Sequence, residues 1–186
     1  MTSSPRDILH LLRQGQLIAL TDETGCSVAC DPQNDAAVEK LLALKAQTEN
    51  PQPITVLIDE VNQLGIYVAK MPEVAFEIVE YSSIPLTVIY EYGKNVSPVL
   101  WTVVNESVHG EPVSGEIAVR KSLNAEVQHL IRGFTKGLLT LPFESKTLPK
   151  AAETAIQARF GELPNQTKLT RIMRLGINGD VGFVRK

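Results

Sequence analysis

A stretch of small polar residues near the start of the chain carries several side chains that could do chemistry. In Leu17–Asp31, LIALTDETGCSVACD, an apolar run gives way to acids, hydroxyls, a glycine and two cysteines. Such a turn could clip a metal ion, cradle phosphates or be an ordinary loop. A structural zinc site needs about four thiolate or imidazole ligands, but Cys26 and Cys30 are the only cysteines and the three histidines are scattered. Two small residues packing near a turn is therefore the favoured interpretation. The adjacent Asp22 and Glu23 make a poor acid–base pair, because neighbouring side chains on an extended chain point apart.

Four other side chains each allow a structural and a functional interpretation. Lys45 ends a helical pattern, where the helix dipole favours a cation, yet it could also supply a point charge to a phosphate. Thr24 could close a turn, and Thr87 suits a β-branched strand. Arg120 ends an apolar strand and could be a solvated edge charge. From these residues alone, both interpretations stay open.

The last basic residues of the chain form its best local basic patch: Lys168, Arg171, Arg174, Arg185 and Lys186. They belong to a predicted hairpin around the Asn178-Gly179 turn. A solvated hairpin face is the simpler interpretation, and contact with RNA phosphates is the alternative. The formal net charge of −3 argues against a protein coated in cations for duplex binding.

Composition and periodicity predict one compact α/β domain, residues 1–186, with a mixed sheet. Hydrophobic residues make up 44% of the 186, which is enough for a real core. Helices are expected at 5–13, 35–45, 71–81, 124–134 and 148–161, with Asn34 and Ser3 or Ser4 as N-caps. Strands are expected at 16–20, 54–58, 86–92, 99–104, 116–120 and 137–141. No signal-peptide pattern, membrane span or Gly-rich phosphate loop is evident, so we expect a cytoplasmic protein outside the dinucleotide and P-loop classes.

Taken in chain order, the polar positions resemble the YrdC/YciO-like family, the threonylcarbamoyl-adenylate synthase superfamily. That family has a P-T-[DE]-T-x-Y-G-L turn, a helix ending in K-x-R-P, a P-x-T strand, a v-R-v-P strand end, an S-x-N pair and a terminal arginine. Here these stand as TDETGCSV, LKAQTENP, PLTVI, IAVRKS, LPFES and GFVR. Matching positions are Glu23, Thr24, Lys45, Thr87, Arg120 and Arg185. Degenerate positions are Cys26, Gln47, Pro142 and Glu144, which replace Tyr, Arg, Ser and Asn.

The resemblance implies a twisted mixed sheet with flanking helices and a concave cleft. In the family this cleft binds ATP with Mg²⁺, threonine and bicarbonate. The product, threonylcarbamoyl-AMP, feeds the modification of adenosine beside the anticodon of certain tRNAs, and members have been described as binding double-stranded RNA. By resemblance, Thr24, Lys45, Thr87, Arg120 and Arg185 are the candidates for holding ATP and threonine, with no metal ligand among the residues of the chain.

The degenerate positions set two hypotheses against each other. The reaction needs positioned cations on phosphate oxygens, and Gln47 cannot imitate the planar fork of an arginine. Glu144 puts a carboxylate where an amide would lie near a triphosphate, unless Lys146 or Arg185 compensates. The first hypothesis is a threonylcarbamoyl-AMP synthase with weakened or lost activity. The second is a non-catalytic module of the same fold that binds a nucleotide or double-stranded RNA. ATP consumption that depends on threonine and bicarbonate separates them.

Overall fold

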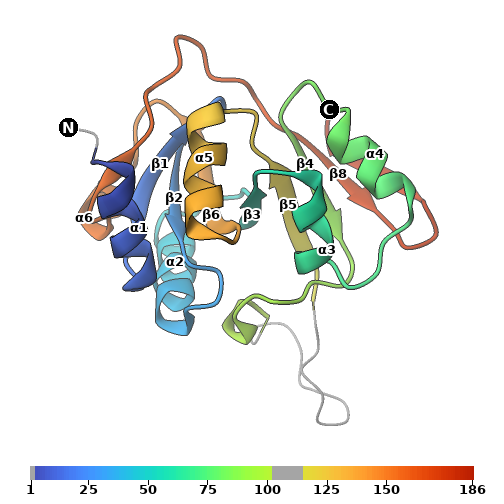
Figure 1. The fold of residues 1–186 in the computed structure, drawn as a ribbon, viewed down its shortest axis with the longest axis horizontal. Coiled ribbons are helices and arrows are strands. Elements are labelled where there is room, and N and C mark those ends of the chain that lie inside the picture. Colours follow the sequence, from blue (N-terminus) through green and yellow to red (C-terminus); the bar gives the residue numbers. More distant parts are fainter. Residues whose placement is uncertain (1–2, 102–114) are drawn as a thin grey trace.

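The computed structural model describes residues 3–101 and 115–186, which form one mixed sheet flanked by helices (Figure 1). The helices are α1 (Pro5–Arg13), α2 (Asp35–Gln47), α3 (Leu64–Tyr67), α4 (Val74–Glu80), α5 (Ala125–Phe134) and α6 (Lys150–Ala155), with 3-10 turns η1 (Val61–Gln63) and η2 (Pro98–Leu100). The strands are β1 (Ile18–Asp22), β2 (Gly25–Cys30), β3 (Thr55–Ile58), β4 (Leu86–Tyr90), β5 (Ile117–Lys121), β6 (Leu138–Ser145), β7 (Arg159–Phe160), β8 (Arg171–Leu175) and β9 (Val181–Arg185). Within the described ranges, no helix is long and apolar enough to cross a membrane.

The sheet confirms the prediction of a mixed α/β architecture. Its strand order is β7-β1-β2-β6-β3-β5-β4-β8-β9. The pairs β1/β7, β3/β5 and β4/β8 are parallel, while β1/β2, β2/β6, β3/β6, β4/β5 and β8/β9 are antiparallel. The predicted hairpin around Asn178-Gly179 is the β8/β9 pair, with Gly179 at φ 85° in its turn. Strands that are distant in sequence therefore lie side by side in the centre of the sheet.

Two hydrophobic clusters hold the helices to the sheet. Leu57 belongs to the cluster of α1 and α5, whereas its neighbours Val56 and Ile58 belong to the cluster of α2, α3, α4 and α6. Because side chains alternate along a strand, these two clusters lie on opposite faces of β3. Figure 1 shows α1 and α5 side by side over β1, β2 and β6.

Side-chain caps begin the longer helices, as the sequence predicts for the first two. The Ser4 side chain accepts a hydrogen bond from the amide of Asp7, and Asn34 accepts one from that of Ala37. Asn124 starts α5 in the same way. Each cap satisfies an amide that has no partner within its helix, which fixes where the helix begins.

Among the sequence predictions that were wrong in extent or type, three concern the edges and the polar stretch of the sheet. The helix expected over 148–161 ends at Ala155, because the following chain pairs with β1 as β7 instead. The strand expected over 99–104 begins as the 3-10 turn η2, and its residues 102–104 lie outside the described residues. The polar stretch after β1 forms a whole strand, β2. Every residue of this strand, from Gly25 to Cys30, is buried.

Candidate functional site

A two-residue hairpin turn lies at the centre of the polar stretch. Asp22 pairs with Gly25, which leaves Glu23 and Thr24 as the turn. One oxygen of Asp22, Oδ1, accepts hydrogen bonds from the Thr24 amide at 2.8 Å and from its hydroxyl at 2.7 Å. Gly25 is needed at φ 108°, because a Cβ there would lie 2.6 Å from the carbonyl oxygen of Ser145. The hydroxyl of Thr24 is therefore bonded inward to Asp22.

Arg120 is the buried centre of an ion-pair cluster with the two acids of this turn. Only 2% of its side chain is exposed, although it was a candidate for a solvated edge charge. Its Nη2 lies 2.5 Å from Asp22 Oδ2, and its Nη1 lies 2.7 Å from Glu23 Oε1. The expectation that the two acids point apart was wrong, because Asp22 ends the strand and Glu23 already belongs to the turn. Two carboxylates therefore share one guanidinium.

Burial sets the electrostatics of this cluster. Burial alone would lower the pKa of Arg120, but the charges of Asp22 and Glu23 outweigh it and raise the pKa. Burial raises the pKa of Glu23, against the opposing charge of Arg120. Glu23 Oε2 is buried and has no hydrogen-bond partner among the described residues. Because Asp22 and Glu23 both bind its guanidinium, the positive charge of Arg120 is neutralised in this arrangement.

Glu144, at the end of β6, binds the second arginine of the site. Its carboxylate accepts hydrogen bonds from Arg185 Nη1 at 2.7 Å and Nη2 at 2.5 Å, and further bonds from the Thr170 amide and Gln52 Nε2. Burial opposes ionisation, but the hydrogen bonds from Arg185 and Thr170 lower the pKa of Glu144. Arg185 thus compensates Glu144, whereas Lys146 donates elsewhere, to the Asn165 carbonyl. Glu144 also has φ 51°, a conformation that favours Asn or Gly over other residues.

Lys45 lies in the last turn of α2 and holds the loop that follows. Its Nζ donates to the carbonyl of Asn50 at 2.6 Å and to that of Gln52. An ammonium has three N–H donors, so one remains for a ligand. Burial lowers the pKa of Lys45. The side chain also lines a hollow of about 450 Å³ together with Pro53, Trp101, Ala118 and Arg174, among others.

The hollow and the buried arginine lie on one face of the sheet. Thr87 of β4 is the register partner of Arg120 of β5. Ile89 and Ala118, two residues along the same strands, line the hollow. Because residues two apart on a strand share a face, Thr87 and Arg120 lie on the face that bears the hollow. The end of α2 therefore brings Lys45 to a hollow whose strand residues share a face with Thr87 and Arg120, and Gln52 links Lys45 to Glu144.

The remaining degenerate positions fall in different places. Gln47 lines a separate hollow with Leu17 and Gln157, so it does not meet Lys45; residues two apart on a helix face different ways. The Pro142 carbonyl accepts a hydrogen bond from Asn50 Nδ2 at 2.9 Å, within the same loop–strand network as Lys45.

Cys26 lies inside β2 and faces protein rather than solvent. Its Sγ lies 3.8 Å from the Thr21 hydroxyl and 3.5 Å from the carbonyl oxygen of Lys146. Burial raises the pKa of its thiol, which disfavours the reactive thiolate. These contacts are those of a packed cysteine.

Sequence reasoning missed Asp22 as the residue that organises the site. The sequence suggests only a weak half of an acid pair at this position, although Asp22 holds Thr24 with one oxygen and Arg120 with the other. Its position immediately before the predicted turn was the available signal, because a short acid there can bond the backbone two residues on. Gln52 and Thr170, which bind Glu144, come from distant loops and had no comparable signal.

Comparison with known protein families decides the ancestry of this site. Residues 10–161 match the Sua5/YciO/YrdC family model, which carries the description "Telomere recombination". The chain belongs to this family. Among its curated relatives, the threonylcarbamoyl-AMP synthase of Photobacterium profundum is 30% identical over 84% of this chain and 81% of its own. The threonylcarbamoyl-AMP synthase of Chromohalobacter salexigens is 28% identical over 84% of this chain and 80% of its own.

Solved structures of the family share the fold. Escherichia coli YciO matches all of this chain and 91% of its own with a TM-score of 0.75 at 16% identity. Sua5 of P. abyssi, solved in complex with L-threonine, matches 92% of this chain with a TM-score of 0.71 at 18% identity, and that match spans 50% of the Sua5 chain. These likenesses establish that the Sua5/YciO/YrdC sheet is the scaffold on which Arg120, Lys45 and Glu144 are placed.

Proposed function

We propose that this chain is a threonylcarbamoyl-AMP synthase relative whose nucleotide cleft is retained but whose synthesis is strongly weakened. Relatives of similar length carry that enzyme's name, which supports the link to tRNA modification. The observation that carries the proposal is the neutralisation of both arginines. Arg120 is bonded to Asp22 and Glu23, and Arg185 is bonded to Glu144.

The reaction depends on free cations, which explains why this pairing matters. In adenylate formation a carbamate oxygen attacks the α-phosphorus of ATP as pyrophosphate leaves, so catalysis consists of positioning and stabilisation of phosphate oxygens. Each charge-assisted hydrogen bond that an arginine cannot offer removes about 1.5–3 kcal/mol. For Arg120 and Arg185 together, about 3–6 kcal/mol corresponds to roughly two to four decades in rate. Within the hollow, Lys45 has one N–H left for a phosphate.

ATP with Mg²⁺ stays the proposed ligand pair, and threonine and bicarbonate the proposed co-substrates. Glu144 does not fit the role of a magnesium ligand, because both of its oxygens are bonded to Arg185. No group of three His, Cys, Asp or Glu side chains in residues 3–101 and 115–186 could hold a metal ion.

Pyrophosphate release measures the proposed activity directly. The purified chain and the Photobacterium relative are assayed in parallel with ATP and Mg²⁺, with and without threonine and bicarbonate. We expect release that depends on both co-substrates to be about 10²–10⁴ times slower than in the relative. A rate within tenfold of the relative's would overturn the proposal.

A non-catalytic module is the second candidate, favoured by the same neutralised arginines. In this case double-stranded RNA or tRNA would bind through basic side chains, of which Lys168 and Arg171 have no ion-pair partner among the described residues. Phosphate contacts make such binding fall steeply with salt. RNA binding with that salt dependence, reduced in Lys168→Ala and Arg171→Ala, would favour this candidate. Salt-independent or absent binding would exclude its RNA-binding form.

A further inference from the structure

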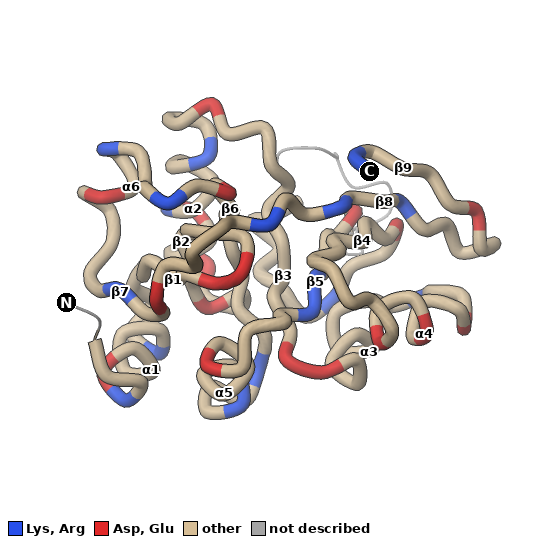
Figure 2. The backbone as a smooth tube through the Cα atoms, turned by 90° about the horizontal axis from the view of Figure 1, so that it is seen from above, with Lys and Arg blue, Asp and Glu red and all other residues tan. Residues whose placement is uncertain are grey.

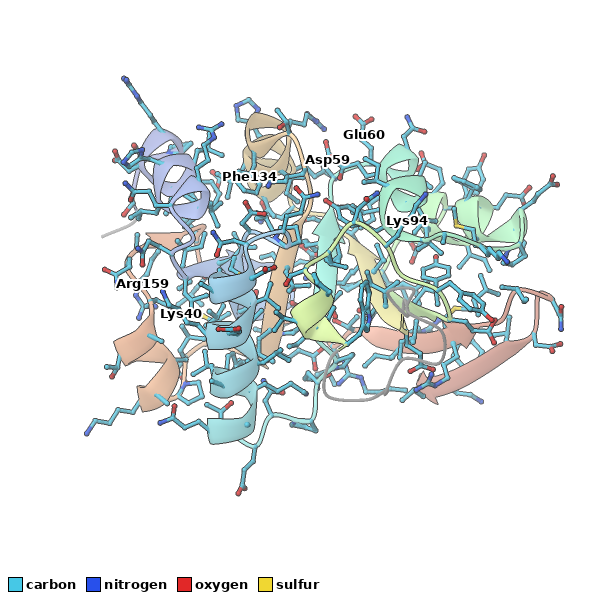
Figure 3. All side chains as sticks on the ribbon, turned by 90° about the horizontal axis from the view of Figure 1, so that it is seen from below. Lys40, Asp59, Glu60, Lys94, Phe134 and Arg159 are labelled. Carbon is cyan, nitrogen blue, oxygen red and sulfur yellow. The ribbon has the colours of Figure 1, made fainter. Side chains whose placement is uncertain are left out.

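Residues 162–170 form a strap that connects distant strands of the sheet. The strap follows β7, which ends at Phe160, and leads into β8, which begins at Arg171. In the strand order β7 is one outer strand, and β8 lies next to the other. Figure 1 shows the strap passing over the top of the sheet, and Figure 2, seen from above, shows it running across the strands into β8. In Figure 3 Arg159 of β7 lies on the side of the molecule opposite the red ribbon of the last strands. The strap therefore spans the width of the sheet.

The strap packs few apolar side chains against the protein. Thr170 is buried, and the other residues of the strap are partly or fully exposed. Leu163 and Leu169, which could have joined a core, are 53% and 70% exposed. A segment with few buried apolar contacts opens at a low cost in free energy. The closed position of the strap therefore depends on its hydrogen bonds.

Both backbone groups of Thr170 are held by the Glu144–Arg185 ion pair. The Thr170 amide donates to Glu144 Oε1 at 3.1 Å, and its carbonyl accepts from Arg185 Nε at 2.7 Å. The other two nitrogens of the same guanidinium donate to the Glu144 carboxylate. A guanidinium is a rigid planar group, so its bonds to Glu144 and to Thr170 are made and lost together.

The remaining anchors of the strap are one backbone bond and one exposed bond. The Lys168 amide donates to the Glu23 carbonyl at 2.9 Å, so the strap also lies on the turn that carries Glu23. Lys146 Nζ donates to the Asn165 carbonyl at 2.8 Å in an exposed position, where water competes for both groups. Within the described part of the chain, the strap is thus bonded to both charged clusters of the candidate site.

We propose that the Glu144–Arg185 pair is a latch that keeps the strap closed over the candidate site, and that phosphate oxygens of a bound nucleotide open it by taking Arg185 from Glu144. A ligand shifts such an equilibrium only as far as it binds one state better. Phosphate oxygens meet this condition, because the bidentate edge of Arg185 is occupied by Glu144 while the strap is closed. The latch does not depend on the proposed function, whereas its release rests on that function, because release needs ligand phosphates in the cleft.

Amide hydrogen exchange at Lys168 tests the latch. This amide bonds to Glu23 and not to Glu144, so a change at Glu144 reaches it only if the strap opens as a unit. Glu144→Gln keeps an oxygen for the Thr170 amide but removes the charge that holds Arg185. We expect exchange at Lys168 to be at least about tenfold faster in this variant than in wild type.

Two references separate strap opening from general destabilisation. Glu153→Gln is the matched control, because Glu153 also pairs with an arginine, Arg159, but outside the strap; we expect it to leave exchange at Lys168 unchanged. The amide of Leu130, a core residue of α5, reports opening of the whole domain. An unchanged rate at Lys168 in Glu144→Gln, or the same acceleration at Lys168 and Leu130, would overturn the latch.

ATP with Mg²⁺ tests the release. Binding to wild type is measured by calorimetry, and exchange at Lys168 is then followed at saturation. We expect exchange to be at least about tenfold faster with ATP than without it, and a smaller response in Glu144→Gln, in which the latch is already weakened. ATP binding with unchanged exchange would overturn the release and leave the proposed function standing. Absence of ATP binding would overturn the proposed function and the release together, and the variants would still decide the latch.

Discussion

Asp22→Asn probes the buried cluster that organises the site. The substitution keeps the size of the side chain and one oxygen for the Thr24 amide and hydroxyl. It removes the negative charge that lies 2.5 Å from Arg120, and the Asp22 side chain is fully buried. Arg120 is then left with Glu23 alone, at 2.7 Å.

The expected loss of stability follows from that geometry. Removing the sole partner of a buried ion pair costs about 3–5 kcal/mol, and one hydrogen bond to a charged group is worth about 1.5–3 kcal/mol. Because Glu23 remains, we expect the free energy of unfolding to fall by about 2–4 kcal/mol. That is a large fraction of the stability of a domain of this size.

Urea unfolding at pH 7 measures the effect, with an unchanged m-value showing that only stability has changed. Glu39→Gln is the control, because Glu39 is exposed on α2 and such surface changes stay within about 0.5 kcal/mol. The double variant Asp22→Asn/Arg120→Met should lose still more stability, because it leaves the buried carboxylate of Glu23 without its cation. If Asp22→Asn lowered the free energy of unfolding by less than about 1 kcal/mol, the view that the Asp22–Arg120 ion pair supports the turn would be refuted.

Three further predictions test other parts of the structure. Glu144→Gln should lower stability by about 1.5–3 kcal/mol at pH 7. Folding lowers the pKa of Glu144 from its ordinary value of 4.5. The difference in free energy of unfolding between wild type and variant should therefore be complete above pH 4.5 and disappear as the pH falls through the folded pKa. A difference that grows between pH 7 and pH 3 in urea unfolding would contradict this sign. Gly161→Ala should lower the melting temperature, because Gly161 has φ 88° and a Cβ would lie 2.2 Å from the Thr21 carbonyl oxygen; an unchanged melting temperature would argue against that close approach. Tyr67→Phe should cost about 1–3 kcal/mol, because the buried Gly137 amide donates to the Tyr67 hydroxyl at 2.7 Å; a neutral result in urea would mean that the amide finds another partner.

Local signals were enough to predict most of the elements. The Asn34 cap and the apolar spacing after it defined α2, and the Asn178-Gly179 pair defined the last hairpin. The strand β7 could not be predicted, because Arg159 and Phe160 become a strand only through pairing with β1. Their local sequence continues a helical pattern, and tertiary pairing overrides it.

The candidate site was predictable in its residue types but not in its pairing. Arg120, Glu144 and Arg185 were all singled out from motif order. Whether an arginine is free or neutralised depends on contacts across about a hundred residues, such as Arg120 with Asp22. The compensation of Glu144 by Arg185 was one of two options that the sequence left open, and the structure selects it.

The central claim is that carboxylates hold the arginines of the cleft away from phosphate chemistry. Glu144→Asn tests it most directly, because Asn suits the backbone at φ 51° and leaves Arg185 without its carboxylate. The measurement is pyrophosphate release that depends on threonine and bicarbonate, compared between this variant and wild type at equal ATP and Mg²⁺. The account predicts a rise of at least about tenfold, which corresponds to roughly 1.4 kcal/mol of transition-state stabilisation. An unchanged rate in a folded variant that binds ATP would contradict it.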